Sequence, residues 1–176
     1  LGDQIDIHGG GRDLIFPHHE SEIAQSEYFT GKRPFVKFWL HTAMVLYRGE
    51  KMSKSLGNLV MVSDLLKYNT ANEIRWLLLS HHYRKPWEFE ENELEEAKVN
   101  LSVVSSAIKG QKRTEIMDSN YMRKFSTPMD DDLNTSQALI FLVELARKII
   151  KNSKNNDETN LKSTLLKCLL VLGFKF

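Results

Sequence analysis

The first sixty residues alternate short apolar runs with glycine-rich and charged turns. Ile5–His8 alternates apolar and polar positions, as a half-buried strand does, and leads into a run of glycines. A helix is expected to begin at Phe16-Pro17, because proline has no N–H to lose at the first helical position, and to end near Gly31. The apolar and aromatic stretch Phe35–Tyr47 predicts a short helical segment and a buried strand. We therefore expect an α/β region over residues 1–60.

After residue 60 the apolar positions recur every three or four residues, the period of amphipathic helices. Ser63 is placed to cap a short helix over Asp64–Tyr68, and Thr70-Ala71-Asn72-Glu73 has the form of a capping box. Later helices are predicted by the apolar series Leu94, Ala97, Leu101, Val104 and Ile108, by Leu142, Leu145 and Ile149, and by Leu161, Leu165, Cys168 and Leu172. The expected fold class is thus α/β followed by all-α, with a helical connector over 61–88 and a helical bundle over 89–176.

The composition narrows the class of protein. The 176 residues amount to about one domain or slightly more, and 41% of them are apolar, enough for a core. The apolar runs fall short of the roughly 20 residues that a membrane span needs, and no signal peptide is visible. A single cysteine excludes an internal disulfide and fits a reducing compartment, so a cytoplasmic location is expected. The net charge of +1 does not indicate a strongly basic surface for nucleic acid, so any contact with nucleic acid would be local.

The segment Lys51-Met52-Ser53-Lys54-Ser55-Leu56-Gly57-Asn58 is the most informative stretch of the chain. Its two lysines stand three positions apart among small residues, so it reads as a flexible cationic loop. Such a loop can fold over a triphosphate and neutralise charge that builds on the β- and γ-phosphates. The spacing is not that of a Walker A loop. A solvated turn is the alternative for the lysines taken alone.

Gly9, Gly10 and Gly11 stand between the predicted strand and the predicted helix, and Asp13 follows them closely. Glycines let a backbone approach a flat ligand, and a nearby carboxylate can accept hydrogen bonds from ribose hydroxyls. An ordinary strand-to-helix turn would have the same composition. The segment is therefore a candidate nucleotide site only in combination with other motifs.

His18 and Glu22 are four residues apart, so they share one face of the predicted helix and can bind one cation together. Imidazole nitrogen and carboxylate oxygen suit zinc, which takes four ligands. Solvated His–Glu pairs at this spacing are common. The sequence has no Cys-x-x-Cys, and Cys168 falls on the packing face of a distant helix.

These motifs together resemble the cysteinyl-tRNA synthetases, a family of class I aminoacyl-tRNA synthetases. The lysine octapeptide resembles the KMSKS loop of that class, and Asp6–Gly11 followed by Phe16–Glu22 resembles catalytic segments of the family. Met129–Thr135 is similar to the signature of the family's helical domain, so the likeness covers nearly the whole chain. The implied fold is the C-terminal half of a Rossmann-type catalytic core, a stem-contact connector and a helical bundle.

The resemblance implies a monomeric ligase that uses ATP, with Mg²⁺, to activate L-cysteine as cysteinyl-adenylate and transfers it to tRNA(Cys), away from membranes. It implies one zinc per parent monomer, held in part by His18 and Glu22, which binds cysteine as thiolate and so favours it over serine. His8 matches an active-site histidine near the zinc. Lys54 matches the ATP-contacting lysine, and Lys51 is its partner. The residues matched to adenosine and ATP binding are Gly9, Gly10, Gly11, Asp13, Val45 and Lys54.

The sequence also departs from the family pattern. Ser21 stands where members commonly have Asn, and Arg12 where a small residue is frequent. The first ATP motif of the His-x-Gly-His type, the two cysteines that complete the zinc site and the anticodon-reading domain are absent from the 176 residues. Because the chain starts at Leu1 and reaches a functional motif within ten residues, we expect a central portion of a longer enzyme, inactive by itself.

Two other interpretations stay open. A related ligase joins activated cysteine to an amino sugar, as in mycothiol synthesis, and shares the zinc, glycine and lysine-loop motifs. The match over Met129–Thr135 favours the synthetase over this ligase. The second alternative is a non-catalytic interaction module, since the sequence carries two proposed zinc ligands and half of a nucleotide site.

Overall fold

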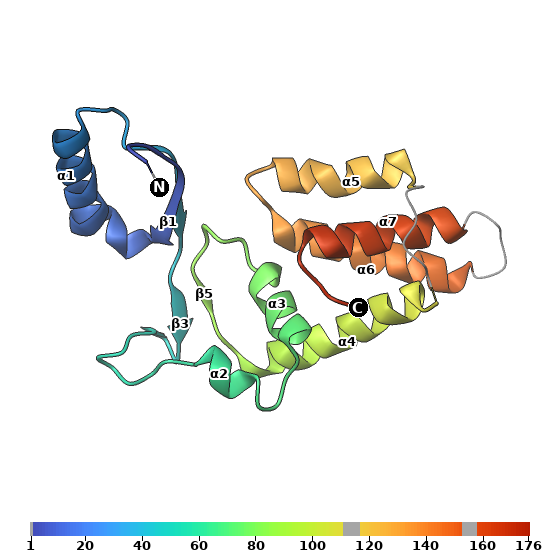
Figure 1. Ribbon diagram of the computed structural model, residues 1–176. Coiled ribbons are helices and arrows are strands. Elements are labelled where there is room, and N and C mark those ends of the chain that lie inside the picture. The colour runs from blue at the N-terminus through green and yellow to red at the C-terminus, as the bar shows by residue number, and fades with distance from the viewer. Residues whose placement is uncertain (1, 111–116, 153–157) are drawn as a thin grey trace. The chain divides into compact units, whose positions relative to one another are not determined.

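The computed structural model of the protein describes residues 2–110, 117–152 and 158–176 (Figure 1). Two compact units divide the chain, one of Leu1–Leu59 with Tyr83–Phe89 and one of Val60–His82 with Glu90–Phe176. Every strand in the described ranges belongs to the first unit, and the second is built of helices. The predicted order, α/β followed by all-α, is confirmed.

The first unit is organised around a parallel strand pair. β1 (Ile5–Gly11) and β2 (Val36–Thr42) pair in parallel, and the chain between them forms α1 (Glu20–Thr30). The expected short helix between residues 35 and 47 is wrong, because β2 is followed directly by the strand β3 (Val45–Tyr47). The β-branched and aromatic side chains of this stretch favour an extended backbone.

The entry to α1 is less regular than the sequence suggests. Two short helical turns, η1 (Arg12–Leu14) and η2 (Ile15–His19), precede it, and within η2 Phe16 keeps an extended backbone with φ −136° and ψ 135°. The predicted end is confirmed, since Gly31 closes α1 in the left-handed conformation with φ 69°. This irregular entry is the segment that carries the histidines of the candidate site.

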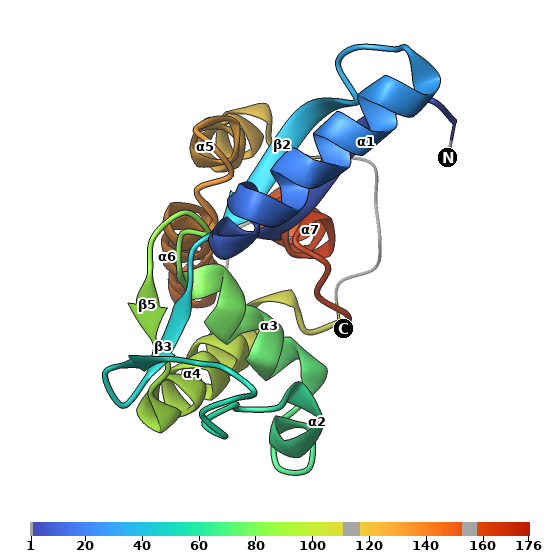
Figure 2. The same ribbon diagram turned by 90° about the vertical axis from the view of Figure 1, so that its left-hand side faces the viewer.

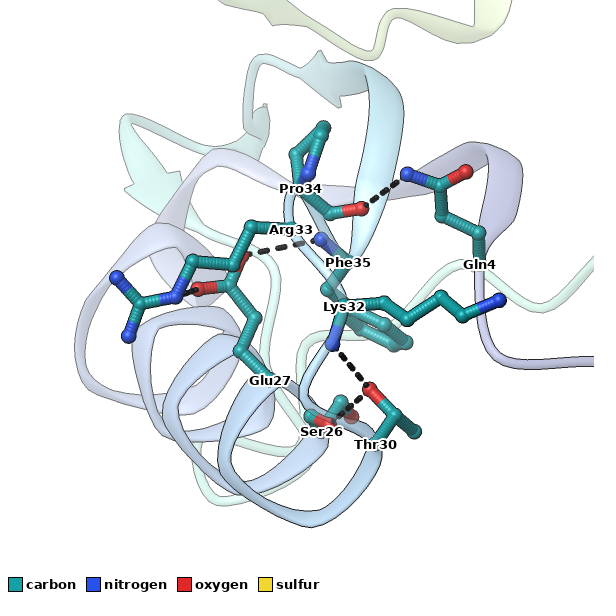
Figure 3. Close-up of polar contacts among 8 residues, drawn as sticks. All are labelled: Gln4, Ser26, Glu27, Thr30, Lys32, Arg33, Pro34 and Phe35. Atoms are coloured by element: carbon teal, nitrogen blue, oxygen red, sulfur yellow. Dashed lines mark hydrogen bonds and ion pairs between the residues drawn. The ribbon is translucent and has the colours of Figure 1, made fainter.

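The connection from α1 to β2 is fixed by polar contacts of Glu27 (Figure 3). Its Oε1 accepts a hydrogen bond from the Phe35 backbone N–H at 3.0 Å, and its Oε2 lies 3.3 Å from Nε of Arg33. Gln4 just before β1 donates from Nε2 to the Pro34 carbonyl at 2.8 Å. These bonds fix where β2 starts beside β1 and so which side chains of the two strands face each other.

A second sheet, of three short strands, supports the lysine loop. β3 pairs antiparallel with β4 (Glu50–Lys51) and parallel with β5 (Trp87–Glu88). The tight turn between β3 and β4 uses Arg48 at φ 55° and Gly49 at φ 78°, the positive values that a two-residue hairpin requires. β4 thus delivers Lys51 directly into the loop.

The second unit is a set of helices around an apolar core. They are α2 (Val62–Leu65), α3 (Ala71–Ser80), α4 (Glu91–Ile108), α5 (Ser119–Asp130), α6 (Thr135–Lys151) and α7 (Glu158–Val171), and Figure 2 views α5 and α7 nearly end-on. The core contains the predicted apolar series of α4, α6 and α7, with Leu142, Leu165 and Cys168 fully buried. Of the predicted positions in these series only Leu161 is half-buried.

Helix starts in this unit test the capping predictions. The capping box of α3 is confirmed: Thr70 N–H donates to Glu73 Oε2 at 2.7 Å, and Glu73 N–H donates to Thr70 Oγ1 at 3.3 Å. The cap assigned to Ser63 is wrong, since α2 already begins at Val62 after Met61. In the described ranges no helix is both long and apolar enough to cross a membrane.

Candidate functional site

Glu22 lies between two histidines. Its Oε2 lies 3.4 Å from Nε2 of His8 on β1, and its Oε1 lies 3.5 Å from Nε2 of His18, four residues earlier in the turn η2. Oε2 is buried and accepts no hydrogen bond. A buried carboxylate oxygen that accepts no hydrogen bond is costly, and a bound cation would satisfy it. The structure therefore brings together the predicted pair His18 and Glu22 and adds His8 to it.

His19 is the buried member of the histidine group, with 3% of its surface exposed. Its Nδ1 shares a 2.8 Å hydrogen bond with Nε2 of His41 on β2. Burial lowers the pKa of His19, and the neighbouring His8 and His41 lower it further. A neutral imidazole keeps a lone pair for a hydrogen bond or a metal ion.

Aromatic rings close this group on the β2 side. Trp39 lies 4.9 Å from the ring of His8 and 5.0 Å from that of His19, and it stacks on His41 at 5.8 Å with an interplanar angle of 5°. The strand register produces this packing, because His8 faces Trp39 and Gly10 faces His41 across the β1–β2 pair. The result is a half-buried cluster of imidazole nitrogens, one carboxylate and an indole ring.

A cation can be held by two overlapping sets of these side chains. Ligand atoms of His8, His19 and Glu22 lie within 4.8 Å of one another. The predicted set of His18 and Glu22 uses Oε1 of the same carboxylate. The side chain of His18 is 58% exposed. Both sets offer imidazole nitrogen and carboxylate oxygen, a donor combination that zinc accepts.

The glycine segment makes room for the protein's own side chains. A Cβ on Gly10 would lie 2.8 Å from Cε1 of His19, and a Cβ on Gly11 would lie 2.5 Å from Oδ1 of Asp13. A Cβ on Gly9 would meet only ordinary contacts. Gly10 is therefore required by the packing of the buried His19 ring, whereas at Gly11 the half-exposed Asp13 carboxylate has room to turn away.

Asp13 and Lys51 form an ion pair. Lys51 Nζ donates to Asp13 Oδ2 at 2.7 Å, and this hydrogen bond lowers the pKa of the Asp13 carboxyl. Both side chains are close to half exposed, at 44% and 46%, so the pair is accessible to a ligand from solvent. The structure thus joins a predicted ribose acceptor to a predicted phosphate-binding lysine, although 38 positions separate them.

Lys54 is in a different position from Lys51. It begins the turn at the tip of the loop and is exposed, and its ammonium group has no hydrogen bond or ion pair in the part of the chain that the structure describes. Val45 lies at the base of the loop, where its carbonyl accepts a hydrogen bond from the Met52 N–H at 3.1 Å. The predicted ATP-contacting lysine is therefore free for an anion.

Three residues of this site were missed from sequence: His19, Trp39 and His41. The signal for His19 was its place three positions before Glu22, a spacing that also puts two side chains on one helix face. Trp39 and His41 depend on the register of β2 against β1. The run of aromatic and apolar residues over Phe38–Leu40, typical of a strand, was the available signal.

Two models of known protein families match this chain. The model described as "tRNA synthetases class I (C) catalytic domain" matches residues 1–99, and the "DALR domain" model matches residues 124–176. The site described above lies entirely within the first match. The two matches together cover most of the chain.

Curated relatives give the same family. The chain is 46% identical over 158 residues to the cysteine–tRNA ligase of Carboxydothermus hydrogenoformans, covering 84% of this chain and 34% of the relative. It is 48% identical over 150 residues to that of Pseudomonas aeruginosa, covering 85% and 32%. With the Acinetobacter baumannii enzyme it shares 41% over 182 residues, covering 98% and 38%. The chain thus spans about a third of the length of these relatives.

Solved structures confirm the fold. The LeuRS–tRNA–LeuAMS ternary complex of Agrobacterium radiobacter superposes with a TM-score of 0.74 at 16% identity, covering 96% of this chain and 25% of that one. Methionyl-tRNA synthetase of Mycobacterium tuberculosis, solved with methionyl-adenylate, gives a TM-score of 0.52 at 18% identity and covers 95% and 40%. With the catalytic-domain match and the identity to curated ligases, the chain belongs to the cysteine–tRNA ligase family of class I aminoacyl-tRNA synthetases.

Proposed function

We propose that the protein containing this chain activates L-cysteine with ATP and esterifies it to tRNA(Cys), as a cytoplasmic monomer. The observation that carries the site assignment is Glu22, whose carboxylate lies between His8 and His18 with a buried oxygen that lacks a hydrogen bond. That arrangement calls for a cation beside a nucleotide segment. Family membership supplies the reaction class.

In the proposal His18 and Glu22 hold zinc, with further ligands supplied from outside the chain. Zinc bound there would supply a soft Lewis acid that prefers a thiolate to a hydroxyl. The buried ring of His19 and the indole of Trp39 fix the orientation of His8 beside the carboxylate. These residues would keep water away from the amino-acid side of the site.

The nucleotide is proposed to bind over the glycine segment, at the carboxyl end of β1. Asp13 would accept hydrogen bonds from the ribose hydroxyls and release Lys51 to the phosphates. The substrate carboxylate then attacks the α-phosphate, and pyrophosphate leaves. Lys51 and Lys54 would stabilise the charge that develops on the leaving phosphates, with Mg²⁺ contributing as part of the substrate.

Each region of the chain has a role in the proposal. We propose that residues 1–60 belong to the catalytic domain, that 61–88 act as the stem-contact connector and that 89–176 form the helical bundle. The DALR match over residues 124–176 supports the last assignment. The tRNA would be the partner of both helical regions.

Metal analysis of the full-length protein tests the proposed site. Glu22→Gln removes the charge between the two histidines, so zinc stoichiometry and thiolate-dependent cysteine binding are expected to fall together. Glu20→Gln changes an exposed neighbour on the same helix and is the matched control. A Glu22→Gln protein that retains stoichiometric zinc and normal cysteine affinity would contradict the assignment.

A further inference from the structure

The lysine loop is closed by one side chain, that of Asn58. Its Oδ1 accepts a hydrogen bond from the Ser53 backbone N–H at 2.8 Å, and its Nδ2 donates to the Lys51 carbonyl at 3.2 Å. Asn58 thereby joins the end of the loop to its beginning. We call the two ends of the loop, Lys51–Ser53 and Asn58, its neck. The Asn58 side chain is half-buried, and its amide nitrogen and amide oxygen both bond to backbone atoms of the neck.

The other bonds within the loop join residues at most three positions apart. Ser53 Oγ and Ser55 Oγ are 3.2 Å apart, the Leu56 N–H donates to Ser53 Oγ at 3.3 Å, and the Gly57 N–H donates to the Lys54 carbonyl at 3.3 Å. They shape the tip, where Gly57 turns the chain with φ 65°. The neck is held by Asn58 and by the Met52–Val45 backbone bond.

We infer that Asn58 is a positioning residue for the two lysines, an inference that rests on the proposed function. Its amide fixes the backbone of Lys51 and Ser53 at the neck and so sets where the tip carries Lys54. One lysine is thereby presented toward Asp13 while the other stays free at the tip. Electrostatic stabilisation of the transition state depends on lysine side chains that are already in position when negative charge develops on the phosphates.

The test compares three variants of the full-length protein in cysteine-dependent ATP–pyrophosphate exchange. Asn58→Ala removes both hydrogen bonds and is expected to lower kcat about tenfold or more, with KM for cysteine changed less than about twofold. Hydrogen exchange of the Ser53 amide should accelerate in the same variant. Asn92→Ala, an exposed asparagine of α4, is the matched control and should change neither quantity.

Asn58→Asp gives a second readout that does not depend on Asn58→Ala folding well. A carboxylate can still accept from Ser53, but it has no hydrogen to donate to the Lys51 carbonyl and repels that oxygen, so kcat should fall although the side chain keeps its size. Unchanged kcat in either Asn58→Ala or Asn58→Asp overturns the inference. A wild-type protein without cysteine-dependent exchange overturns the proposed function instead, and the amide exchange then still decides whether Asn58 closes the loop.

Discussion

At the scale of single residues, the two lysines of the signature loop have distinct surroundings. Lys51 is paired with Asp13 at 2.7 Å, whereas Lys54 stands exposed at the tip. A ligand that takes Oδ2 of Asp13 displaces Lys51, whereas Lys54 needs no such release. We expect Lys54 to meet the phosphates first, with Lys51 joining as its pair with Asp13 opens.

Lys54→Ala should therefore lower the rate of adenylation more than it affects amino-acid binding. The expected loss in kcat is about tenfold or more, because one charge is removed from the developing leaving group, while cysteine affinity stays near the wild-type value. Steady-state ATP–pyrophosphate exchange measures both quantities. Lys98→Ala removes a surface lysine paired with Glu95 and serves as control. Equal losses of rate and affinity in Lys54→Ala would indicate a structural role instead.

The candidate site was only partly predictable from these residues. His18 and Glu22 follow from helical spacing. Gly10 and Gly11 were expected between the strand and the helix, but they are the last residues of β1 and pair with β2, and of these three only Asp13 follows the strand. The contact of His19 with His41 spans 22 positions and exists because β1 and β2 pair in one register. The Asp13–Lys51 pair spans 38 positions for the same kind of reason. Local patterns carry no information on such distances.

At the scale of secondary structure, periodicity was reliable for long helices and weak for short elements. α4, α6 and α7 bury the predicted series, while β2 was mistaken in part for a helix. α5 was not foreseen: its polar composition left only Phe125 buried, and a proline, Pro128, lies inside it. Its start is marked by Asp118, whose Oδ1 accepts from the Asn120 and Tyr121 N–H groups, a capping signal that was available.

The Met129–Thr135 signature has a structural explanation at this scale. It spans the corner from α5 to α6, where Asp132 and Leu133 take positive φ values of 51° and 55°. Asn134 then caps α6 by accepting a hydrogen bond from Gln137 N–H at 3.3 Å. The motif thus forms a tight turn between two helices, which accounts for its polar residues.

Packing of α6 can be tested with one matched pair of substitutions. Leu142→Ala truncates a side chain with no exposed surface at the centre of the core and should lower the free energy of unfolding by about 2–5 kcal/mol. Ile140→Ala, on the same helix but 52% exposed, should change it by no more than about 1 kcal/mol. Chemical denaturation measures both. Equal effects would show that α6 does not bury the face described here.

At the scale of the whole molecule, Cys168 is a natural reporter of the second unit. It is completely buried on α7, its Sγ lies 3.7 Å from Met122 Sδ, and burial raises its pKa to about 12. Since the native pKa exceeds the unfolded value of 9.0, the bundle should keep this contribution to stability below pH 9.0 and lose it as the pH rises toward 12.

Cys168 should accordingly resist thiol reagents until the bundle opens. At pH 8 in the native protein we expect modification at least about a hundredfold slower than in the denatured chain, because the thiolate forms only after exposure. Stopped-flow labelling with and without denaturant measures the ratio. Rapid labelling of the native protein would contradict the packing of α7 against α5.

The two units and the family matches together define the central claim, that this chain is part of an enzyme that charges tRNA with cysteine. The most direct measurement supplies the full-length protein with ATP and labelled cysteine, and offers tRNA(Cys) and an amino sugar as separate acceptors. We predict label esterified to the tRNA and none joined to the amino sugar. Transfer to the amino sugar, or no activation of cysteine at all, would contradict the account.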